Sequence, residues 1–565
     1  MGLEQSRVWF DVGVLMRDGV RLSTDIYFPK DGASGGPYPA VLGRTPYDNE
    51  TPTQVEMARA LADDGFVVAL QDVRGRHDSD GEWLPFRNEG PDGYDTIEWI
   101  AEQGWCTGQV GTFGGSYGGW YQWAAAREKP PHLTTMISTA TGGAWMEEVP
   151  FHNGCFLLVM LGWLHLVGGR SMQQPQLVDD WPAVLRHLPL QTMDERLGRS
   201  MPIWREWLSH PTLDEYWQQV RLDDDFAHID VPALHITGWY DGDQPGALYF
   251  HRGMTGSSPR ARDQHIVIGP WDHAGTRVPK QVLGGVDFGP SALEDIIGLH
   301  KTWFGHWLRG GGDQSLDQPR ARLFRTGANE WHHADAWPLP STEVSWYLHS
   351  AGRANTLVGD GSLSAEPPSG DEPADSFGYD PNDPVPSVLD ENFYSPAAVE
   401  TPLDRRFQHR RDDVLSYTCD VRGDSLVISG HPRVRLFASS DGLDTDWFLA
   451  LHDIAPTGAS MLLCEGRMRA RFRTSLARET LLEPGATYEY EIELSAVNHL
   501  LRPGHRLRLT VTSSDFPTWD RNPNTGVPIG TDTALRAAIN TVHHGASQPS
   551  ALVLPVADQL DLDSA

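Results

Sequence analysis

Continuous apolar runs of strand length alternate with helix-like segments over the first 145 residues. The apolar runs span residues 40–43, 66–70 and 110–113, and helix-like segments lie between them at 53–64 and 94–103. Strands that are apolar on both faces are typical of a parallel sheet covered by helices on both sides. The pattern therefore predicts an α/β fold in this part of the chain.

The strand signal stops after about residue 145 and resumes at residues 233–237 and 265–268. The stretch between is rich in Trp, Leu, Met and His and has helical character. A helical insertion within one α/β domain is the simplest explanation. We therefore expect one α/β domain formed by residues 1–145 and 236–345, with a helical cap formed by residues 146–235.

The hydrophobic period changes to two in the last third of the chain. Apolar and polar residues alternate at 488–494 and 506–512, which is typical of antiparallel strands with one exposed face. Loops at 366–373 and 380–386 are rich in Pro and Asp and too rigid for strand or helix interiors. Several strands with no long helix between them predict a β-sandwich or jelly roll over residues 346–565.

The strongest local motif is Gly-Gly-Ser-Tyr-Gly-Gly at residues 114–119, directly after the strand run and before a helix-compatible run at 120–127. A G-x-S-x-G sequence in this position is typical of a nucleophile elbow, whose glycines permit a sharp turn that exposes the serine hydroxyl. The backbone N–H of Tyr117 would then face a carbonyl oxyanion. The order strand, elbow, helix favours Ser116 as a nucleophile over a glycine-rich turn with an ordinary serine.

A nucleophilic serine needs a histidine to take its proton and a carboxylate to orient that histidine. In such folds the partners follow in the order serine, acid, histidine, each just after a strand. Asp241 follows the run 233–237 and His273 follows the run 265–268. We therefore predict Asp241 as the acid and His273 as the base.

Other residues compete for these two roles. Asp243 and Asp272 lie in the same loops as Asp241 and His273, but Asp241 comes first after its strand. Among the 23 histidines, the nearest competitors are His152, His165 and His235. The first two fall in the predicted cap and break the expected order, and the third lies inside a strand run, which leaves His273 as the preferred base.

Charge and cysteine content narrow the classes of function. The chain has 45 basic and 76 acidic residues, a net charge of −31, which disfavours binding to nucleic acid or to an anionic membrane. Its four cysteines lie far apart without metal-ligand spacing, so neither a disulfide framework nor a zinc site is expected. The most apolar run, 155–168, has 14 residues, whereas a membrane helix needs about 20. With no signal peptide evident, we expect a cytoplasmic protein.

These motifs resemble the cocaine esterase-like branch of the X-prolyl dipeptidyl-peptidase superfamily of serine hydrolases. The resemblance extends from about residue 8 to about residue 525, and its matching segments are 43–48, 71–76, 114–119, 238–242, 269–273, 329–331 and 506–519. It implies an α/β-hydrolase domain with a helical cap and a C-terminal jelly roll packed beside the pocket. It also implies that Ser116, Asp241 and His273 form a catalytic triad.

The resemblance implies one further residue, Tyr47. In these enzymes a tyrosine hydroxyl joins the backbone N–H after the nucleophile to form the oxyanion hole, and the matching motif here is Arg-Thr-Pro-Tyr-Asp at residues 44–48. A phenol suits this role because its O–H is a rigid donor. The expected oxyanion hole therefore consists of the Tyr47 hydroxyl and the Tyr117 N–H.

One departure from the family bears on the substrate. The related α-amino-acid ester hydrolases carry a carboxylate cluster that binds an ammonium group, part of it just after the catalytic Asp. Here Asp243 keeps one acidic position, but Gln244 replaces the next. Asp243 is thus either an amine ligand or a solvated loop carboxylate. Large apolar residues of the cap could line an acyl pocket or pack the cap helices together: Trp145, Phe151, Phe156 and Trp163.

The sequence predicts a serine hydrolase that cleaves carboxylic ester or amide bonds of small-molecule acyl substrates through an acyl-enzyme, without metal or organic cofactor. One alternative is an X-prolyl dipeptidyl-peptidase or an α-amino-acid ester hydrolase or acyltransferase that recognises a free amine. Another is a binding protein with a vestigial catalytic domain, which an intact Ser116, Asp241 and His273 disfavours. No nucleic-acid or membrane partner is expected, and a homo-oligomer is left open.

Overall fold

A mixed sheet organises the N-terminal half of the computed structural model, which describes residues 6–310, 316, 318–389, 400–421 and 423–557. Seven neighbouring strands from β4 to β13 run parallel, and β1, β2 and β14 add antiparallel edges. In spatial order the strands are β1 (Val8–Leu15), β2 (Arg21–Tyr27), β4 (Val67–Asp72), β3 (Tyr38–Thr45), β5 (Cys106–Gly115), β6 (Leu133–Thr139), β9 (Ala233–Gly238), β10 (Gln264–Gly269), β13 (Ala321–Arg325) and β14 (Glu330–Ala334).

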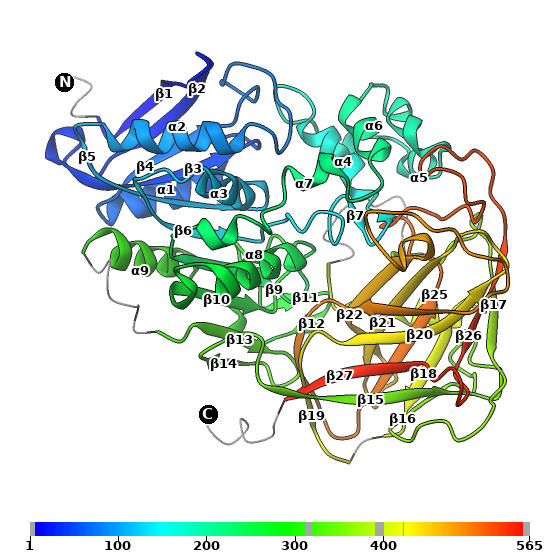
Figure 1. The fold of residues 1–565 in the computed structure, drawn as a ribbon. Helices are drawn as coiled ribbons and strands as arrows, with labels where there is room; N and C mark the ends of the chain where they lie inside the picture. The colour runs from blue at the N-terminus through cyan, green and yellow to red at the C-terminus, as the bar shows by residue number, and fades with distance from the viewer. Residues whose placement is uncertain (1–5, 311–315, 317, 390–399, 422, 558–565) are drawn as a thin grey trace.

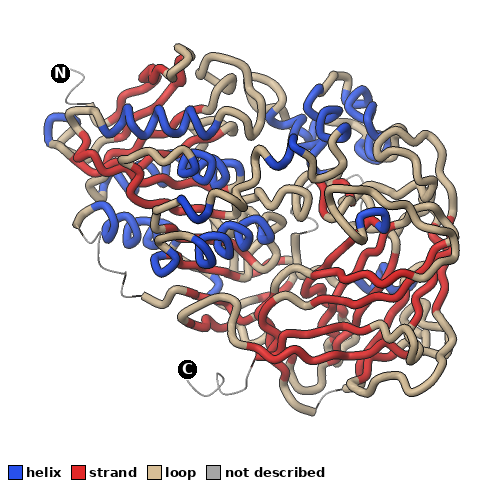
Figure 2. Tube along the Cα trace, viewed as in Figure 1, coloured by secondary structure: helices blue, strands red, loops and turns tan. Residues whose placement is uncertain are grey.

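Helices cover both faces of this sheet, as Figure 2 shows. Helices α1 and α9 pack on one face with Val41 and Val68, and α2, α3 and α8 pack on the other with Leu42 and Val67. Successive strand residues therefore enter opposite cores, which explains why these strands are continuously apolar. The helices are α1 (Pro52–Asp63), α2 (Glu89–Ala101), α3 (Tyr117–Arg127), α8 (Gln244–Ser257) and α9 (Ile296–Leu308).

The cap lies between β6 and β9 and occupies the upper right of Figure 1, next to the C-terminal half of the chain. Its core holds the fully buried indoles of Trp204, Trp207 and Trp217. It is mainly helical, with one short hairpin that the sequence did not predict. Its elements are β7 (Phe151–His152), β8 (Cys155–Phe156), α4 (Val159–Val167), η3 (Pro175–Leu177), α5 (Trp181–Leu185), η4 (Leu190–Leu197), α6 (Pro202–Ser209), α7 (Glu215–Gln218) and η5 (Phe226–His228).

The C-terminal domain is built almost entirely of strands around a second core, in which Trp447 and Leu509 are fully buried. Among the described residues, its named strands pair antiparallel except for β16 and β18. The strands are β15 (Ser341–His349), β16 (Ser362–Ser364), β17 (Asp375–Tyr379), β18 (Leu415–Cys419), β19 (Leu426–Gly430), β20 (Arg433–Ser440), β21 (Asp446–Ile454), β22 (Ser460–Arg469), β23 (Tyr488–Glu493), β24 (Val497–Leu501), β25 (Arg506–Thr512), β26 (Ala538–His543) and β27 (Ala551–Ala557).

Short elements connect these layers. They are η2 (Ala33–Gly35), η6 (Ala261–Asp263), β11 (Val282–Leu283), β12 (Val286–Asp287), η7 (Pro290–Ala292), η9 (Arg405–Arg410) and η10 (Ala470–Phe472). The apolar run at 155–168 forms β8 and the nine-residue α4. Among the described residues, no helix has the length and apolar character needed to cross a bilayer.

The predicted fold class, an α/β domain with a helical cap and a C-terminal β-domain, is confirmed. Two boundaries shift by a few residues. The strand β9 begins at Ala233, because residues 233–235 already pair with β10, so the cap ends before residue 235. Similarly, β15 begins at Ser341 and pairs with β27, so the C-terminal domain begins before residue 346.

Candidate active site

Ser116 forms the turn between β5 and α3. Its backbone has φ 61° and ψ −127°, a left-handed conformation that costs a non-glycine residue about 1–3 kcal/mol. The Ser116 N–H donates to the carbonyls of Thr139 and Ala140, each at 3.0 Å, which holds this strained turn against the end of β6. The serine hydroxyl is thereby presented at the carboxyl edge of the sheet, as the motif predicts.

The flanking glycines are required by close contacts. A Cβ on Gly114 would overlap the Gly118 carbonyl, and a Cβ on Gly119 would overlap the Thr141 hydroxyl. The elbow therefore depends on the absence of side chains at the positions where β5, α3 and the loop after β6 meet.

Asp241 and His273 lie in the loops after β9 and β10 and contact each other directly. The His273 Nδ1 lies 2.8 Å from Asp241 Oδ1, while Asp241 Oδ2 accepts a hydrogen bond from the Thr237 hydroxyl at 2.8 Å. Although burial opposes ionisation, the charge of His273 and these hydrogen bonds hold the pKa of Asp241 below its ordinary value. An ionised Asp241 fixes the tautomer with the proton on Nδ1, which leaves Nε2 free to accept a proton.

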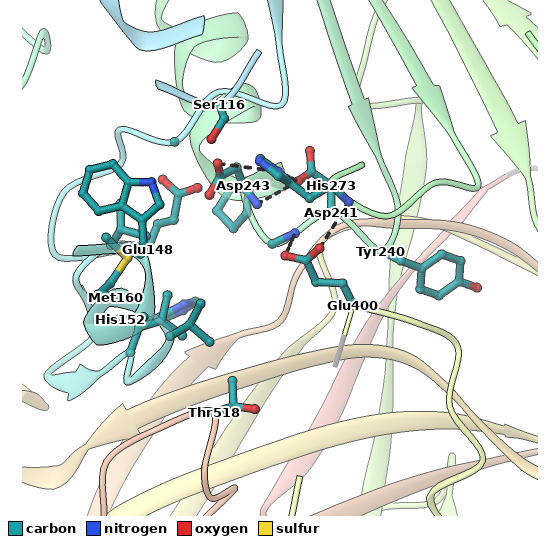
Figure 3. A pocket seen from close by; sticks show the side chains of 18 of the residues that line it. Ser116, Glu148, His152, Met160, Tyr240, Asp241, Asp243, His273, Glu400 and Thr518 are labelled. Carbon is teal, nitrogen blue, oxygen red and sulfur yellow. Dashed lines mark hydrogen bonds and ion pairs between the residues drawn. The ribbon is translucent and has the colours of Figure 1, made fainter. Parts of the chain in front are cut away.

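Ser116 and His273 lie at the same end of one cavity, which both residues line (Figure 3). In the described part of the chain no hydrogen bond joins the Ser116 hydroxyl to the imidazole. Such contacts are often long in the absence of substrate and tighten when it binds. The structure therefore brings together the three residues predicted as a triad, and their catalytic roles stay predictions.

Tyr47 follows β3 and faces the nucleophile. Its Oη lies 3.5 Å from Ser116 Oγ and accepts a hydrogen bond from the indole Nε1–H of Trp163 at 2.9 Å. Burial raises the pKa of Tyr47, so the phenol keeps its proton. Because Trp163 occupies an acceptor position of Oη, the hydroxyl proton is free to point toward an oxygen beside Ser116.

Tyr117 contributes differently through its side chain and its backbone. Its hydroxyl donates to Glu89 Oε1 at 2.7 Å and accepts the N–H of Phe86 at 3.2 Å, so the ring is anchored by residues behind the elbow. Its own N–H is the first in α3 and has no acceptor within that helix. The backbone N–H of Tyr117 is thus placed to serve the predicted oxyanion hole.

A cavity of about 530 Å³ adjoins these groups and is lined by all three parts of the molecule. Trp145 and Trp163 lie on its cap side, and Asp243 lies beside His273, so these three predicted pocket residues do reach the cavity. Residues of the C-terminal domain, including Leu463 and Trp519, complete the wall. This size is typical of a small-molecule site.

Phe151 and Phe156 do not line this cavity, contrary to the prediction. They are fully buried and pack edge to face against each other with ring centroids 4.7 Å apart. Phe156 also packs edge to face on Trp204 at 5.0 Å. Both rings belong to the cap core because they lie on the β7–β8 hairpin, which the sequence did not reveal.

The competing residues have other environments. His152 lines the cavity well away from Ser116, where burial and the charge of Arg467 lower its pKa. His235 is buried in β9 and bonded to Gln264 at 3.1 Å. Asp272 accepts the N–H of Gly275 at 2.6 Å and shapes the turn after His273.

Three carboxylates on the cavity wall were missed by sequence reasoning: Glu148, Glu400 and Glu465. Glu148 Oε2 accepts the N–H groups of Gly143 at 2.8 Å and Ala144 at 3.0 Å, and the backbone N–H of Gly246 also stabilises the ionised carboxylate. Among the described residues, its buried Oε1 accepts no hydrogen bond of ordinary geometry. Figure 3 shows Glu148 and Asp243 with their carboxylates facing one another. Each is one acidic residue among 76, and no local pattern marks it out.

The protonation of these carboxylates follows from their surroundings. Burial raises the pKa of Glu148 to about 7. Burial also raises the pKa of Asp243, with a contribution from the nearby Glu148. Burial and the charge of Asp241 raise the pKa of Glu400 to about 8. No group of three or more His, Cys, Asp or Glu side chains in the described ranges is arranged to hold a metal ion.

Comparison with known proteins extends this picture to the whole chain. Residues 18–275 match the X-Pro dipeptidyl-peptidase (S15 family) model, and residues 315–553 match the X-Pro dipeptidyl-peptidase C-terminal non-catalytic domain. The cocaine esterase of Rhodococcus sp. (strain MB1 Bresler) is 37% identical over 97% of this chain and 98% of its own length.

Two solved structures share the complete architecture. An aminopeptidase from the marine sediment archaeon Thaumarchaeota archaeon superimposes with a TM-score of 0.88 and 28% identity, covering 99% of this chain and 98% of its own. An α-amino acid ester hydrolase superimposes with a TM-score of 0.87 and 27% identity, covering 98% of both chains. Since both domain models match in order and the esterase relative is similar from end to end, the chain belongs to the cocaine esterase-like (CocE/NonD) serine hydrolases of the X-Pro dipeptidyl-peptidase superfamily.

Proposed function

We propose that this serine hydrolase cleaves carboxylic ester bonds, and amide bonds more slowly, in small acyl substrates through an acyl-enzyme at Ser116. One observation carries the proposal: the strained Ser116, the Asp241–His273 pair and the Tyr47 hydroxyl all face a single cavity. A binding protein with a vestigial site would have no need to maintain this strain and these contacts.

The proposed reaction has two symmetrical halves. Ser116 Oγ attacks the substrate carbonyl carbon while His273 Nε2 takes the hydroxyl proton, and Asp241 stabilises the resulting imidazolium. The carbonyl oxygen becomes an oxyanion that receives hydrogen bonds from Tyr47 Oη and the Tyr117 N–H. His273 then returns its proton to the leaving alcohol or amine, and a water molecule repeats the sequence to release the acid and free Ser116.

Covalent labelling tests the nucleophile. A fluorophosphonate should label the wild-type protein, and Ser116→Ala should remove both the label and the hydrolysis of p-nitrophenyl esters. Persistence of the label in Ser116→Ala would place the nucleophile elsewhere. A panel of p-nitrophenyl esters, anilides and β-lactam side-chain amides would then rank ester against amide cleavage and define the acyl group.

A second candidate function is favoured by the Glu148–Asp243 pair. Within the described residues Glu148 Oε1 is buried and accepts no hydrogen bond of ordinary geometry, and such an oxygen is costly unless a donor completes it. The pair lies on the cavity wall near the reacting groups, so an ammonium group on the acyl part of a substrate would supply the missing hydrogen bonds and charge. We infer that this pair binds the ammonium group of the substrate and that amino-acyl esters are therefore a preferred substrate class.

N-Acetylation of the substrate tests this candidate. An amino-acyl ester should be hydrolysed with a higher kcat/KM than its N-acetylated form, because only the free amine carries a positive charge. Glu148→Gln and Asp243→Asn should reduce this preference while leaving the N-acetylated ester much less affected. Equal kcat/KM values for the two esters in the wild-type protein would reject amine recognition and leave the esterase proposal intact.

A further inference from the structure

Glu400 connects the two loops that carry Asp241 and His273. Its Oε1 accepts the N–H of Gly242 at 3.2 Å, and its Oε2 accepts the N–H of His273 at 3.2 Å. Figure 3 shows both hydrogen bonds reaching one carboxylate. Gly242 directly follows Asp241, so Glu400 is bonded to the backbone beside the acid and to the backbone of the base.

We propose that Glu400 is a positioning residue that holds the acid loop and the base loop at a fixed separation for the reaction proposed above. The two oxygens of a carboxylate are rigidly spaced, so two N–H groups bound to them cannot drift apart. The imidazole can keep its 2.8 Å contact with Asp241 only while the two loops stay in register. A displacement of about 1 Å at such a site can lower the rate roughly 100-fold.

The acid loop is shaped to admit this carboxylate. A Cβ built on Gly242 would overlap Glu400 Oε1, so any side chain at position 242 would displace Glu400 from the loop. The glycine is therefore explained by the approach of Glu400. It also provides a way to break the contact without removing the Glu400 side chain.

Glu400 lies in a different part of the chain from the two loops that it connects. It lies 127 residues from His273, within the region matched by the C-terminal non-catalytic domain model. We infer that this domain supplies a group that directly organises the catalytic loops. Its role at the site is thus more than the apolar wall formed by residues such as Leu463.

Two substitutions test the contact from opposite sides. Glu400→Ala removes the carboxyl group, and Gly242→Ala displaces it while the Glu400 side chain remains. Each should lower kcat for a neutral p-nitrophenyl ester by roughly 10- to 100-fold with little change in KM. The rate constant for fluorophosphonate labelling should fall by a similar factor, because it reports how well His273 activates Ser116.

The double variant and a milder substitution sharpen the test. Glu400→Ala and Gly242→Ala should not be additive, because both break the same contact. Glu400→Gln keeps one acceptor for one of the two N–H groups and should give an intermediate loss. If Glu400→Ala does not fold, Gly242→Ala and Glu400→Gln still decide the matter.

A matched control separates this effect from general loosening of the domains. Thr326, after β13, bonds His499 of β24 across the same domain boundary through its hydroxyl at 2.8 Å and does not line the cavity. Thr326→Val should lower the melting temperature while leaving kcat and the labelling rate near wild-type values. Comparing the variants at equal folded fraction removes stability as a variable.

Three results would overturn the proposal. Wild-type labelling rates in folded Glu400→Ala and Gly242→Ala would show that the acid loop and the base loop keep their separation without Glu400. A rise in KM confined to amine-bearing esters would make Glu400 a substrate ligand. A loss in Thr326→Val equal to that in Glu400→Ala would make the effect one of domain docking. If the wild-type protein itself takes no label, the proposed function fails rather than the positioning role.

Discussion

The Tyr47 hydroxyl allows the sharpest test of the proposed oxyanion hole. Tyr47→Phe removes only the oxygen that lies 3.5 Å from Ser116 Oγ and leaves the ring in place. Loss of one oxyanion donor lowers kcat by roughly 10²–10³-fold, or about 2.7–4 kcal/mol of transition-state stabilisation. Because burial raises the pKa of Tyr47, the phenol stays protonated and the loss should persist at every pH where the protein is folded and active.

Trp163 gives this prediction a second measurement. Its indole N–H donates to Tyr47 Oη at 2.9 Å, and its ring stacks on Phe86 and Trp207 with interplanar angles of 15° and 13°. Trp163→Phe keeps an aromatic ring in this stack but loses the donor. A neutral hydrogen bond contributes about 0.5–1.5 kcal/mol, so kcat should fall by about 2- to 13-fold.

The two substitutions form a double-mutant cycle. If the Trp163 N–H acts by orienting the Tyr47 hydroxyl, Trp163→Phe should have no further effect on kcat in the Tyr47→Phe background. The assay is single-turnover acylation with a p-nitrophenyl ester, which separates the chemical step from product release. Additive losses would refute the orienting role of the Trp163 N–H. An unchanged rate in Tyr47→Phe would refute the assignment of Tyr47 to the oxyanion hole.

Three further predictions address the acid, the amine ligands and the cap. Asp241→Asn should lower kcat by about 10⁴-fold, measured on p-nitrophenyl esters, because an amide favours the wrong tautomer of the histidine. Preference for a free amine over its N-acetylated form should grow as pH rises from about 5 to about 7, because burial raises the pKa of Glu148 to about 7 and its charge forms as that value is approached. An α-amino group, with a pKa of about 7.7–8.0, stays protonated over this range, so a preference independent of pH there would exclude Glu148. Phe156→Ala should lower the free energy of unfolding by about 3–5 kcal/mol in denaturant titrations while KM stays unchanged. A large rise in KM would show instead that Phe156 lines the pocket.

Sequence patterns predicted the parts of the site that local structure determines. The elbow at Ser116 and the loops bearing Asp241 and His273 each follow a buried parallel strand, and strands buried on both faces leave a clear apolar signal. A strand also fixes where its following loop begins, so the order of the three residues could be deduced before their distances were known. The strand β1 was not predicted because it is largely exposed, and β2 was not predicted because its buried run contains the polar residues Ser23, Thr24 and Asp25.

The rest of the site depends on contacts between distant segments. Glu148 becomes a cavity residue only because the loop after β6 turns its backbone N–H groups toward the carboxylate. Glu400 reaches the acid loop across 158 residues of sequence. Phe151 and Phe156 were misassigned because an apolar side chain in a cap is equally suited to a pocket wall and to a core, and only the β7–β8 hairpin decides between them.

The carboxylates around His273 give part of the chain's acidity a catalytic meaning. Four full negative charges in so small a volume would repel one another. The structure avoids this because its carboxyls differ in protonation. Asp241 is held ionised by His273, while burial raises the pKa of Glu148 to about 7 and of Glu400 to about 8. A substrate ammonium bound at the Glu148–Asp243 pair would lower the pKa of both carboxyls and so favour their ionised forms. The ionisation of Glu148 and Asp243 is thereby coupled to the charge of the substrate. The positive charge of an amine-bearing substrate would neutralise the negative charge that it induces, so the contact between Asp241 and His273 would stay unchanged.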